Sequence, residues 1–371
     1  MGIENTKERF EVLDIFRGLF ASMVIFYHLA PFADTWLLNN PLIKHSDLFV
    51  DFFFVLSGFV IAYKYSNLNT NTTFSNFLKR RFYRLYPLHI IMLLVFLCIE
   101  FSKHFLVGYV RINELNNPDN NPLTFAWSIL MLNSVKLPGV HDVSWNIPSW
   151  SVSAEMIAYL FFGLLTVFLH QTTLTKQRNL FYLIIICGTL GLIYLITDSG
   201  KLNYTYDYGF LRGIIGFFTG TLCQSAYLAI KERLKKRSSA FFNGGELLCV
   251  LLNVLMIYHG ESLANKGVVF EILFFATILI FAFEQGIISR TLKKSSFLNK
   301  MGHRSYSIYL IHALFISLFN VLFIRILKFP PTAYSYLFIV NYLVIFIAAG
   351  WTYKNIEQRF MLKRKARPEE S

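Results

Sequence analysis

Residues 13–31 read LDIFRGLFASMVIFYHLAP, an apolar stretch of membrane-spanning length with an arginine near its start and a histidine near its end. Arg17 and His28 are eleven residues apart. On a helix, this spacing places both side chains within ~20° of one face and ~16 Å apart along the axis. Because an ionisable side chain inside hydrocarbon costs roughly 2.5–3.5 kcal/mol on the insertion scale, the pair indicates a functional site.

The composition of the chain argues against a soluble globular protein. Of 371 residues, 55% are hydrophobic and only 15% are charged, which leaves too little polar surface to cover a soluble fold. The net charge of +13 comes from short basic clusters between apolar segments, a pattern typical of membrane orientation. We therefore predict an all-α, polytopic integral membrane protein in contact with the lipid bilayer and without a nucleic-acid partner.

Apolar windows long enough to form transmembrane helices recur along the chain, about ten in number. They cover residues 11–31, 48–66, 81–106, 150–170, 179–197, 208–229, 245–259, 267–285, 305–327 and 333–352. The two short windows at 245–259 and 267–285 are the weakest. An error in either of them would invert the topology of everything between them.

Basic residues cluster in alternate loops and at both ends of the chain. The clustered side contains Lys7 and Arg9; Lys79, Arg80, Arg81 and Arg84; Lys176 and Arg178; Lys231, Arg233, Lys235, Lys236 and Arg237; Arg290, Lys293, Lys294, Lys300 and Arg304; and Lys354, Arg359, Lys363, Arg364, Lys365 and Arg367. The opposite loops contain only isolated cations, namely Lys44, Arg111, Lys136, Lys201, Lys266 and Lys328. By the positive-inside rule, this asymmetry predicts an even number of helices in the inner or plasma membrane, with both termini cytoplasmic.

The organisation along the chain predicts a single transmembrane domain over residues 1–360, followed by a basic cytoplasmic tail at 361–371. Residues 107–148 contain the Asn/Pro-rich NELNNPDNNP and then the apolar TFAWSILMLN. We predict an extracytoplasmic loop followed by an interfacial or re-entrant segment. The four cysteines lie in apolar segments without metal-type spacing, so we expect no metal site.

Arg80, Arg81 and Arg84 lie at the cytoplasmic entry of the third predicted helix, in LKRRFYRLYP. Arg81 and Arg84 are three residues apart and share a helix face, and forked guanidinium donors in that arrangement suit phosphate. A positive-inside anchor would also explain the charge, but it would not explain the preference for arginine over lysine. Arg17 also has a structural interpretation, as a snorkelling arginine or a partner of Asp14.

Glu155 lies about one turn into the fourth predicted helix, at a predicted depth comparable to that of His28. A carboxylate beside an imidazole can orient it as the base that removes a proton from an alcohol. Asp51, in the first turn of the second predicted helix, is an alternative orienting group, although an acidic residue there is also ordinary helix capping. The alternative interpretation of His28 is an interfacial histidine near Pro31, without a catalytic role.

Hydroxyl and indole groups accompany these motifs. Ser57, Ser151 and Ser153 are candidate donors to an oxyanion, and nothing in one sequence selects among them. We interpret Trp145 and Trp150 as interfacial aromatic residues, with platforms for a sugar ring as the alternative.

Three further ionisable residues near predicted helix ends have ordinary structural roles available to them. We interpret His312 as a packed, hydrogen-bonded histidine about two turns from the cytoplasmic side. Glu357 is interpreted as an ion-pair partner of Arg359 at the inner surface, and Arg212 as a snorkelling side chain.

The order of these motifs resembles the membrane acyltransferase-3 family. The motifs are an arginine, ten residues and a histidine on the first helix; VDFFFVLSGF; KRRFYRLYP; WSVSAE; SYSIYLIH; and a terminal NIE. Each motif alone is weak, but all of them in this order over residues 10–360 are specific. Proteins of this family are ten-helix membrane enzymes that transfer acyl groups, usually acetyl from acetyl-CoA, to hydroxyls of extracytoplasmic carbohydrates.

The resemblance implies functional roles at particular positions of this chain, namely Arg17, His28, Arg81, Arg84 and Glu155. Many relatives have a second acidic residue where this chain has Met156, so the requirement for a carboxylate would rest on Glu155 alone. Some relatives also carry a C-terminal hydrolase-like domain that helps to deliver the acyl group. This chain has no such segment after the predicted helices, and we therefore expect direct transfer.

Together these observations predict an O-acyltransferase that takes acetyl-CoA, or another acyl-CoA, from the cytoplasm and a carbohydrate or glycolipid acceptor from outside. We expect the arginines to bind phosphate or pantetheine groups and His28 to act as general base, with an acyl-histidine intermediate as the variant. The ~16 Å between Arg17 and His28 is of the order of the reach of the CoA thiol arm.

Two other classes of protein are alternatives. Buried arginine, histidine and glutamate also suit a proton-coupled transporter or flippase of an anionic or carbohydrate substrate. Paired broken helices in two related halves would favour such a transporter, and the sequence contains no evident repeat of this kind. The second alternative is a non-catalytic scaffold in envelope polysaccharide assembly, in which the polar residues would all be structural.

Overall fold

The computed structural model describes residues 9–65, 68, 71–109 and 117–361, and these ranges contain helices and loops but no strand. The predicted all-α fold is therefore confirmed. Of the predicted tail at 361–371, all but the first residue lies outside the described residues.

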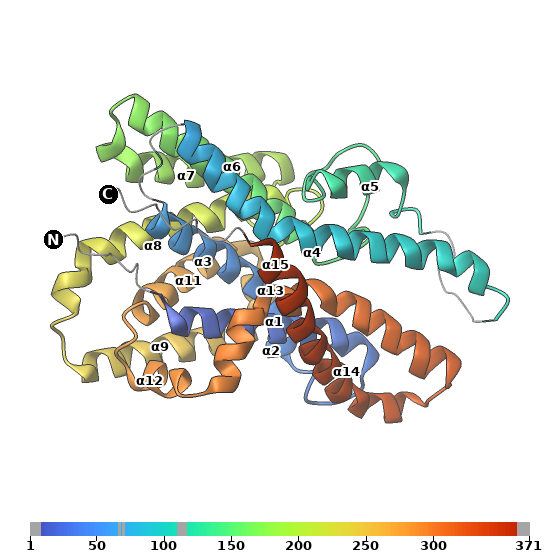
Figure 1. Ribbon diagram of the computed structural model, residues 1–371. Helices are drawn as coiled ribbons and strands as arrows, with labels where there is room; N and C mark the ends of the chain where they lie inside the picture. Colours follow the sequence, from blue (N-terminus) through green and yellow to red (C-terminus); the bar gives the residue numbers. More distant parts are fainter. Residues whose placement is uncertain (1–8, 66–67, 69–70, 110–116, 362–371) are drawn as a thin grey trace, which may run out of the picture.

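The helices are connected mostly by short loops (Figure 1). Their bounds are α1 Glu11–Leu29, α2 Pro41–Lys44, α3 Phe49–Lys64, α4 Asn71–Leu106, α5 Pro122–Ile129, α6 Ser149–Gln171, α7 Arg178–Thr197, α8 Gly209–Leu234, α9 Ser239–Tyr258, α10 Gly260–Leu263, α11 Val268–Phe281, α12 Ile287–Lys293, α13 Ser296–Phe319, α14 Pro331–Thr352 and α15 Gln358–Phe360. Short 3-10 or π-helical turns extend several of them.

Within the described ranges, nine helices are long and apolar enough to cross a membrane. They contain α1, α3, α4, α6, α7, α8, α9, α13 and α14. A tenth crossing requires the segments Gly260–Lys266 and Val268–Phe281 together, which meet at an angle of 103°. The prediction of a polytopic membrane protein with about ten helices is confirmed, and the broken pair coincides with the weak window at 267–285.

The packing of α1 against α13 decides whether this broken pair crosses. The two helices run in the same direction, because Arg9 before α1 lies 3.1 Å from His303, and His28 near its end contacts His312. When two spans run in the same direction, the number of crossings that precede the second span, counting the first span, must be even. Eight crossings precede α13 only if α10 and α11 together form one span. This gives ten spans and places the start of α1 and the end of α14 on one side.

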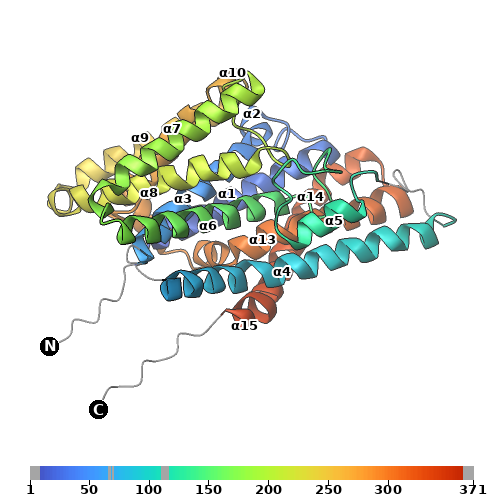
Figure 2. The same cartoon turned by 90° about the horizontal axis from the view of Figure 1, so that it is seen from above.

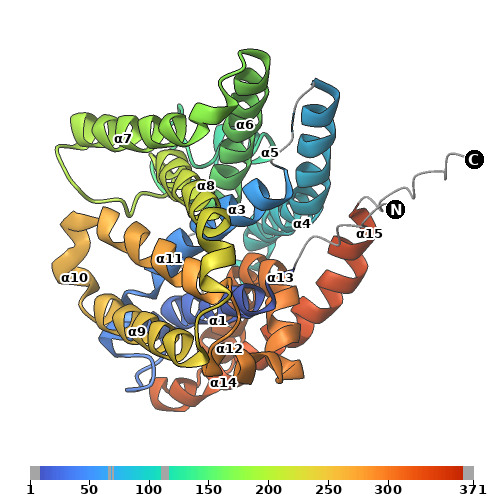
Figure 3. The ribbon, with the colours of Figure 1, turned by 90° about the vertical axis from the view of Figure 1, so that its left-hand side faces the viewer.

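The helices α3 and α8 form the buried centre of the bundle, whereas α7 lies at its edge (Figure 3). In their most apolar windows, 72% of α8 and 67% of α3 are buried, against 11% of α7. The backbones of α3 and α8 touch, since a Cβ atom at Gly58 would lie 1.8 Å from the carbonyl oxygen of Phe217. This close approach holds the neighbouring residue Ser57 in place.

Figures 1 and 2 show α4 as a single long helix, which runs for 36 residues from Asn71 to Leu106. The prediction that Arg80, Arg81 and Arg84 lie at a helix entry is therefore wrong, because the helix begins more than two turns earlier. A hydropathy window stops at charged residues. The helix itself continues, since its backbone hydrogen bonds do not depend on side-chain polarity.

The described part of the 107–148 segment packs on the membrane helices (Figure 2). Residues 122–129 form α5, which is held by a capping box at Asn121 and by a hydrogen bond of 2.8 Å from the His89 ring to the Ser128 carbonyl oxygen. Trp145 is buried and its indole donates to Thr124 at 3.1 Å, so its interpretation as an interfacial residue is wrong.

Candidate functional site

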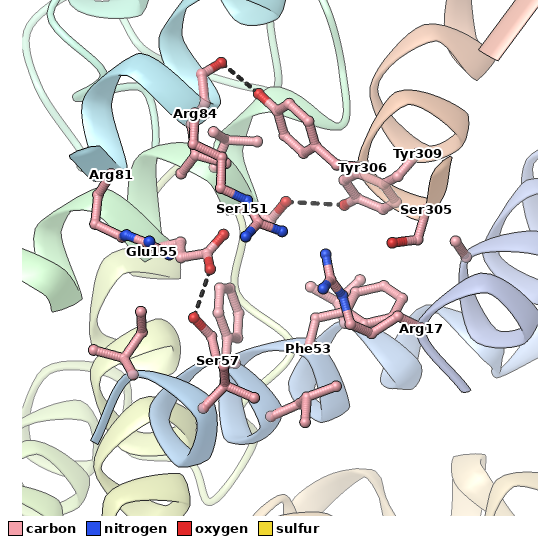
Figure 4. Close-up of a pocket in the computed structure, with 18 of the residues that line it drawn as sticks. Arg17, Phe53, Ser57, Arg81, Arg84, Ser151, Glu155, Ser305, Tyr306 and Tyr309 are labelled. Carbon is pink, nitrogen blue, oxygen red and sulfur yellow. Dashed lines mark hydrogen bonds between the residues drawn. The ribbon is translucent and has the colours of Figure 1, made fainter. Parts of the chain in front are cut away.

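A polar cavity opens between α1, α3, α4, α6 and α13 (Figure 4). Its polar lining residues are Arg17, Ser57, Arg81, Arg84, Ser151, Glu155, Tyr159, Ser305, Tyr306 and Tyr309. The remaining lining residues are aliphatic or aromatic side chains, which come mainly from α3. Helices far apart in the sequence thus bring ionisable groups together inside the membrane domain, an arrangement typical of a functional site.

Three arginines from two helices face this cavity. Arg17 lies 3.4 Å from the Asp14 carboxylate, whereas Arg81 donates to the Tyr65 hydroxyl at 3.2 Å and also stacks over the Tyr65 ring. Figure 4 shows Arg84 between Glu155 and Tyr306. The structure therefore brings together three of the four arginines that were predicted to bind the cofactor. Arg80 is exposed and does not line the cavity, so its predicted place beside them is wrong.

Glu155 is the carboxylate of the cavity. It accepts a hydrogen bond of 2.6 Å from Ser57 and a short one from Tyr159, which lies one helical turn further along α6. Among the described residues it has no hydrogen bond to His28, and it faces Arg81 and Arg84 (Figure 4). The prediction that Glu155 orients His28 is therefore not supported by this geometry.

One end of the cavity is formed by Tyr309 and Ser151. The Ser151 hydroxyl donates to the Tyr309 hydroxyl at 3.0 Å and thereby joins α6 to α13. On its other side, Tyr309 contacts His312, and the two ring centroids are 5.7 Å apart. This single aromatic side chain thus lies between the cavity and an imidazole pair.

The imidazole pair consists of His28 on α1 and His312 on α13, whose ring centroids are 5.0 Å apart. His28 is partly exposed and does not line the arginine cavity, whereas His312 is fully buried. His312 is packed and hydrogen-bonded as predicted, but its predicted depth is wrong. Because α13 begins at Ser296, His312 lies about 24 Å along the helix and level with His28.

Asp51 belongs to a separate cluster. Its carboxylate forms a buried ion pair with Arg212 at 2.5 and 2.9 Å, and Trp150 stacks on the same guanidinium at 5.3 Å. Arg212 does not snorkel, Asp51 neither caps its helix nor orients His28, and Trp150 is buried instead of interfacial. Those interpretations are wrong, because Arg212 joins Asp51 and Trp150 across three helices, and the position of a residue along its own helix does not reveal such partners.

Two other predicted residues have structural partners. Ser153 hydrogen-bonds the Ser134 hydroxyl at 2.8 Å and donates to the Met131 carbonyl oxygen at 2.7 Å, which anchors α6 to the preceding loop. It does not line the cavity. Glu357 is buried and accepts a hydrogen bond from Ser307, so its interpretation as a surface partner of Arg359 is wrong.

Three tyrosines of the cavity are not among the candidate residues predicted from the sequence. Tyr159 follows Glu155 by four residues, a spacing that places both side chains on one helix face and that the sequence already contained. Tyr306 and Tyr309 lie in the SYSIYLIH motif, three residues apart. The hydroxyl of Tyr306 donates to the Leu85 carbonyl oxygen at 2.6 Å and so ties α13 to α4.

Two relatives overlap parts of the chain. The "Protein 2 in picA locus" of Rhizobium radiobacter is 31% identical over 163 residues, which are 42% of this chain and 81% of that protein. The "Acyltransferase MdmB" of Streptomyces mycarofaciens is 34% identical over 116 residues, which are 31% of this chain and 27% of that protein. No solved structure matches the chain at a significant level.

The family described as "Acyltransferase domain", of the acyltransferase-3 type, matches residues 10–350 and therefore nearly the whole membrane bundle. This match contains every residue that lines the cavity, together with both imidazoles. The chain is a multi-pass membrane protein and an acyltransferase, and it belongs to the acyltransferase-3 family.

Proposed function

We propose that this acyltransferase moves an acetyl group from cytoplasmic acetyl-CoA to a hydroxyl of a carbohydrate or glycolipid at the extracytoplasmic face, with His28 as general base. The observation that carries the proposal is the convergence of Arg17, Arg81 and Arg84 on one cavity in an acyltransferase. The head of CoA carries several phosphates, and forked guanidinium donors bind phosphate well.

The position of the arginines fits a donor that enters from the clustered basic side. Arg17 lies two turns into α1, whereas His28 lies ~16 Å further along the same helix. The phosphates can therefore bind at the arginines while the pantetheine arm extends toward Tyr309 and the imidazole pair behind it. Because His28 is partly exposed, an acceptor can approach it from the opposite face without entering the arginine cavity.

In the proposed reaction, the acceptor hydroxyl oxygen attacks the thioester carbonyl carbon while His28 removes the hydroxyl proton. The new ester C–O bond forms and the C–S bond of the thioester breaks. The proton passes from His28 to the departing CoA thiolate, so the products are an O-acetylated acceptor and free CoA. We assign Glu155 to the cavity, where its charge partly balances the arginines and its position is held by Ser57 and Tyr159.

The test of this proposal uses purified protein in liposomes, with labelled acetyl-CoA on the arginine side and candidate glycans on the other. Wild type should transfer label to the glycan. His28→Ala should transfer it about 10²–10⁴-fold more slowly, the usual contribution of a general base. The matched control is His170→Ala, because His170 lies at the far end of α6 and hydrogen-bonds the Thr166 carbonyl oxygen of its own helix.

Two results would overturn the proposal. One is a wild type that labels no glycan acceptor while it remains folded, and the other is a His28→Ala variant that transfers acetyl as fast as wild type. Movement of unlabelled glycan across the liposome without acetylation would instead support the transporter alternative.

The arginine cavity has its own test, which is CoA binding measured by calorimetry. Arg17→Ala, Arg81→Ala and Arg84→Ala should each raise the Kd for CoA about 10–100-fold, since a hydrogen bond to a charged group contributes about 1.5–3 kcal/mol. Arg233→Ala is the control, because Arg233 is exposed at the end of α8. Unchanged CoA affinity in all three cavity variants would remove the phosphate-binding role.

A further inference from the structure

His312 is a buried imidazole with one nitrogen committed and the other without a partner. Its Nδ1 hydrogen-bonds the carbonyl oxygen of Tyr309, and its Nε2 is buried without a hydrogen-bond partner among the described residues. A carbonyl oxygen only accepts, so Nδ1 carries the hydrogen. In the neutral ring, Nε2 then has a free lone pair and is an acceptor.

The imidazole packed against this acceptor is that of His28. The two ring centroids are 5.0 Å apart and the ring planes are tilted by 35°. This separation is compatible with a hydrogen bond of ~2.7–3.2 Å between one ring nitrogen of each histidine once the rings turn their nitrogens toward each other. Catalytic hydrogen bonds commonly tighten in this way only when substrate binds.

The register of α1 and α13 holds the two rings at one level. The helices touch at Gly18 and Gly302, where an added Cβ atom would lie 2.6 Å from the Met301 carbonyl carbon and 2.4 Å from the Asp14 carbonyl oxygen, respectively. Each histidine follows its glycine by ten residues, which is ~15 Å along a helix. Because the helices are parallel, the equal spacing makes the imidazoles meet.

The carboxylates that sequence reasoning assigned to His28 have other partners. Glu155 accepts hydrogen bonds from Ser57 and Tyr159, and Asp51 binds Arg212. A base needs a group that fixes its tautomer, and the second ring nitrogen is the usual place for that contact. Of Glu155, Asp51 and His312, only His312 contacts the His28 ring and has a ring nitrogen without a hydrogen-bond partner in the described part of the chain.

We propose that His312 is the positioning residue of the catalytic base. Its Nε2 accepts a hydrogen bond from one ring N–H of His28, which fixes the tautomer of His28 and leaves the other nitrogen free to take the acceptor proton. The chain of contacts runs from the Tyr309 carbonyl through His312 to His28. This inference rests on the proposed function of His28 as the general base.

The kinetic test compares two substitutions at one buried position. His312→Phe keeps an aromatic ring but removes both nitrogens, and it should lower kcat about 10–100-fold with little change in KM for acetyl-CoA, a part of the 10²–10⁴-fold that a general base supplies. His312→Gln restores an acceptor oxygen near the position of Nε2 and should recover much of the loss. A double variant with His28→Ala should be no slower than His28→Ala alone.

A second measurement does not depend on turnover. Solid-state NMR of protein with 15N-labelled histidine, in bilayers, reports which nitrogen of His28 carries the hydrogen, and His28→Ala identifies the signal. Wild type and His312→Gln should show one His28 tautomer, and His312→Phe should show a mixture. Wild-type tautomer behaviour without any acetyl transfer would refute the proposed function but keep the positioning role.

The inference is overturned if folded His312→Phe retains the wild-type kcat or a single His28 tautomer. It is also overturned if His312→Gln behaves like His312→Phe in both measurements, because the role would then depend on something other than the acceptor. Loss of CoA affinity in parallel with kcat would mean that His312 only supports the fold around the cavity.

Discussion

At the scale of single residues, the ion pair between Asp51 and Arg212 is the most deeply buried charge pair among the described residues. Both side chains are almost inaccessible, with 5% of the Asp51 side chain and 2% of the Arg212 side chain exposed. Removing one partner from such a pair leaves an uncompensated charge in a medium that cannot solvate it. The pair therefore makes the folding of α3 and α8 depend on both residues.

We predict that Arg212→Ala lowers the free energy of unfolding by about 3–5 kcal/mol, the usual cost of breaking a buried pair. The double variant Asp51→Asn, Arg212→Leu should be less damaging than Arg212→Ala, because it removes both charges of the pair instead of leaving the Asp51 carboxylate without its partner. Thermal unfolding of the detergent-purified protein measures both. Equal stability of Arg212→Ala and the exposed-residue control Arg233→Ala would contradict the prediction.

A partly exposed ion pair between Glu284 and Lys293 lies beside the first turn of α1. Glu284 accepts from the Val12 backbone N–H at 3.0 Å and from Lys293 at 2.8 Å. The hydrogen bond from Lys293 to Glu284 and the negative charge of Glu284 raise the pKa of Lys293 above its usual value. A raised pKa means that the charged lysine stabilises the fold at low pH and that this contribution is lost as pH rises through the folded-state pKa.

We therefore expect Lys293→Met to be slightly less stable than wild type at pH 8, by up to about 1 kcal/mol for a partly exposed pair. The difference should shrink as pH rises through the pKa of Lys293. Thermal midpoints of the two proteins at several pH values provide the measurement. A difference that stays constant or grows with pH would show that the ion pair is not its cause.

At the scale of helices, α3 and α8 fit together only because small residues occupy their contact. A Cβ atom at Gly58 would lie 1.8 Å from a carbonyl oxygen of α8, whereas one at Gly188 on α7 would meet nothing within 4 Å. Both glycines lie inside transmembrane helices, so alanine has the same intrinsic effect on each helix. A comparison of the same substitution at Gly58 and at Gly188 therefore distinguishes the effect of helix packing from that of helix propensity.

We predict that Gly58→Ala destabilises the protein by about 1–3 kcal/mol, the typical cost of overpacking. Gly188→Ala should be neutral or stabilise the protein by up to about 1 kcal/mol, since alanine favours helix. Gly58→Ala should also reduce acyl transfer, because it displaces Ser57 and with it Glu155. Thermal stability and transfer rate are measured on both variants, and similar values for the two would refute the role of close packing.

At the scale of the whole molecule, the broken pair α10 and α11 determines the topology. Parallel packing of α1 and α13 requires this pair to cross the membrane, which places the α8–α9 loop and the α12–α13 loop on one side. The positive-inside rule makes that side cytoplasmic, a statement that stays a prediction.

In a protein without its native cysteines, we expect Lys236→Cys and Lys294→Cys to be protected from an impermeant maleimide added to intact cells. Ser262→Cys, which is exposed in α10 at the start of the broken pair, should react, because this end of the pair lies on the opposite side. Labelling after cell lysis is the control for accessibility. Reaction of Lys294→Cys but not of Lys236→Cys in intact cells would show that the broken pair does not cross.

Much of this molecule was predictable from local patterns, and the exceptions have a common cause. Windows of apolar residues found the membrane helices, and the spacing of Arg17 and His28 placed both on one face of α1. The windows placed the starts of α4 and α13 too late, because Lys79, Arg80 and Arg304 interrupt the run of apolar residues without interrupting the helix. The depth of His312 was misjudged for that reason.

By itself, the sequence determined the class of the fold, the approximate number of spans, the arginine-to-histidine stripe of α1 and the motifs of the acyltransferase-3 family. Hydropathy and helical periodicity are local properties, so a single chain displays them. Only the tertiary structure decided which partner each polar side chain has. Asp51 pairs with Arg212, Glu155 hydrogen-bonds Ser57 and Tyr159, and His28 contacts His312. Those pairings depend on the register between helices, which is set by backbone contacts such as that of Gly18 with Gly302, almost three hundred residues apart in the sequence.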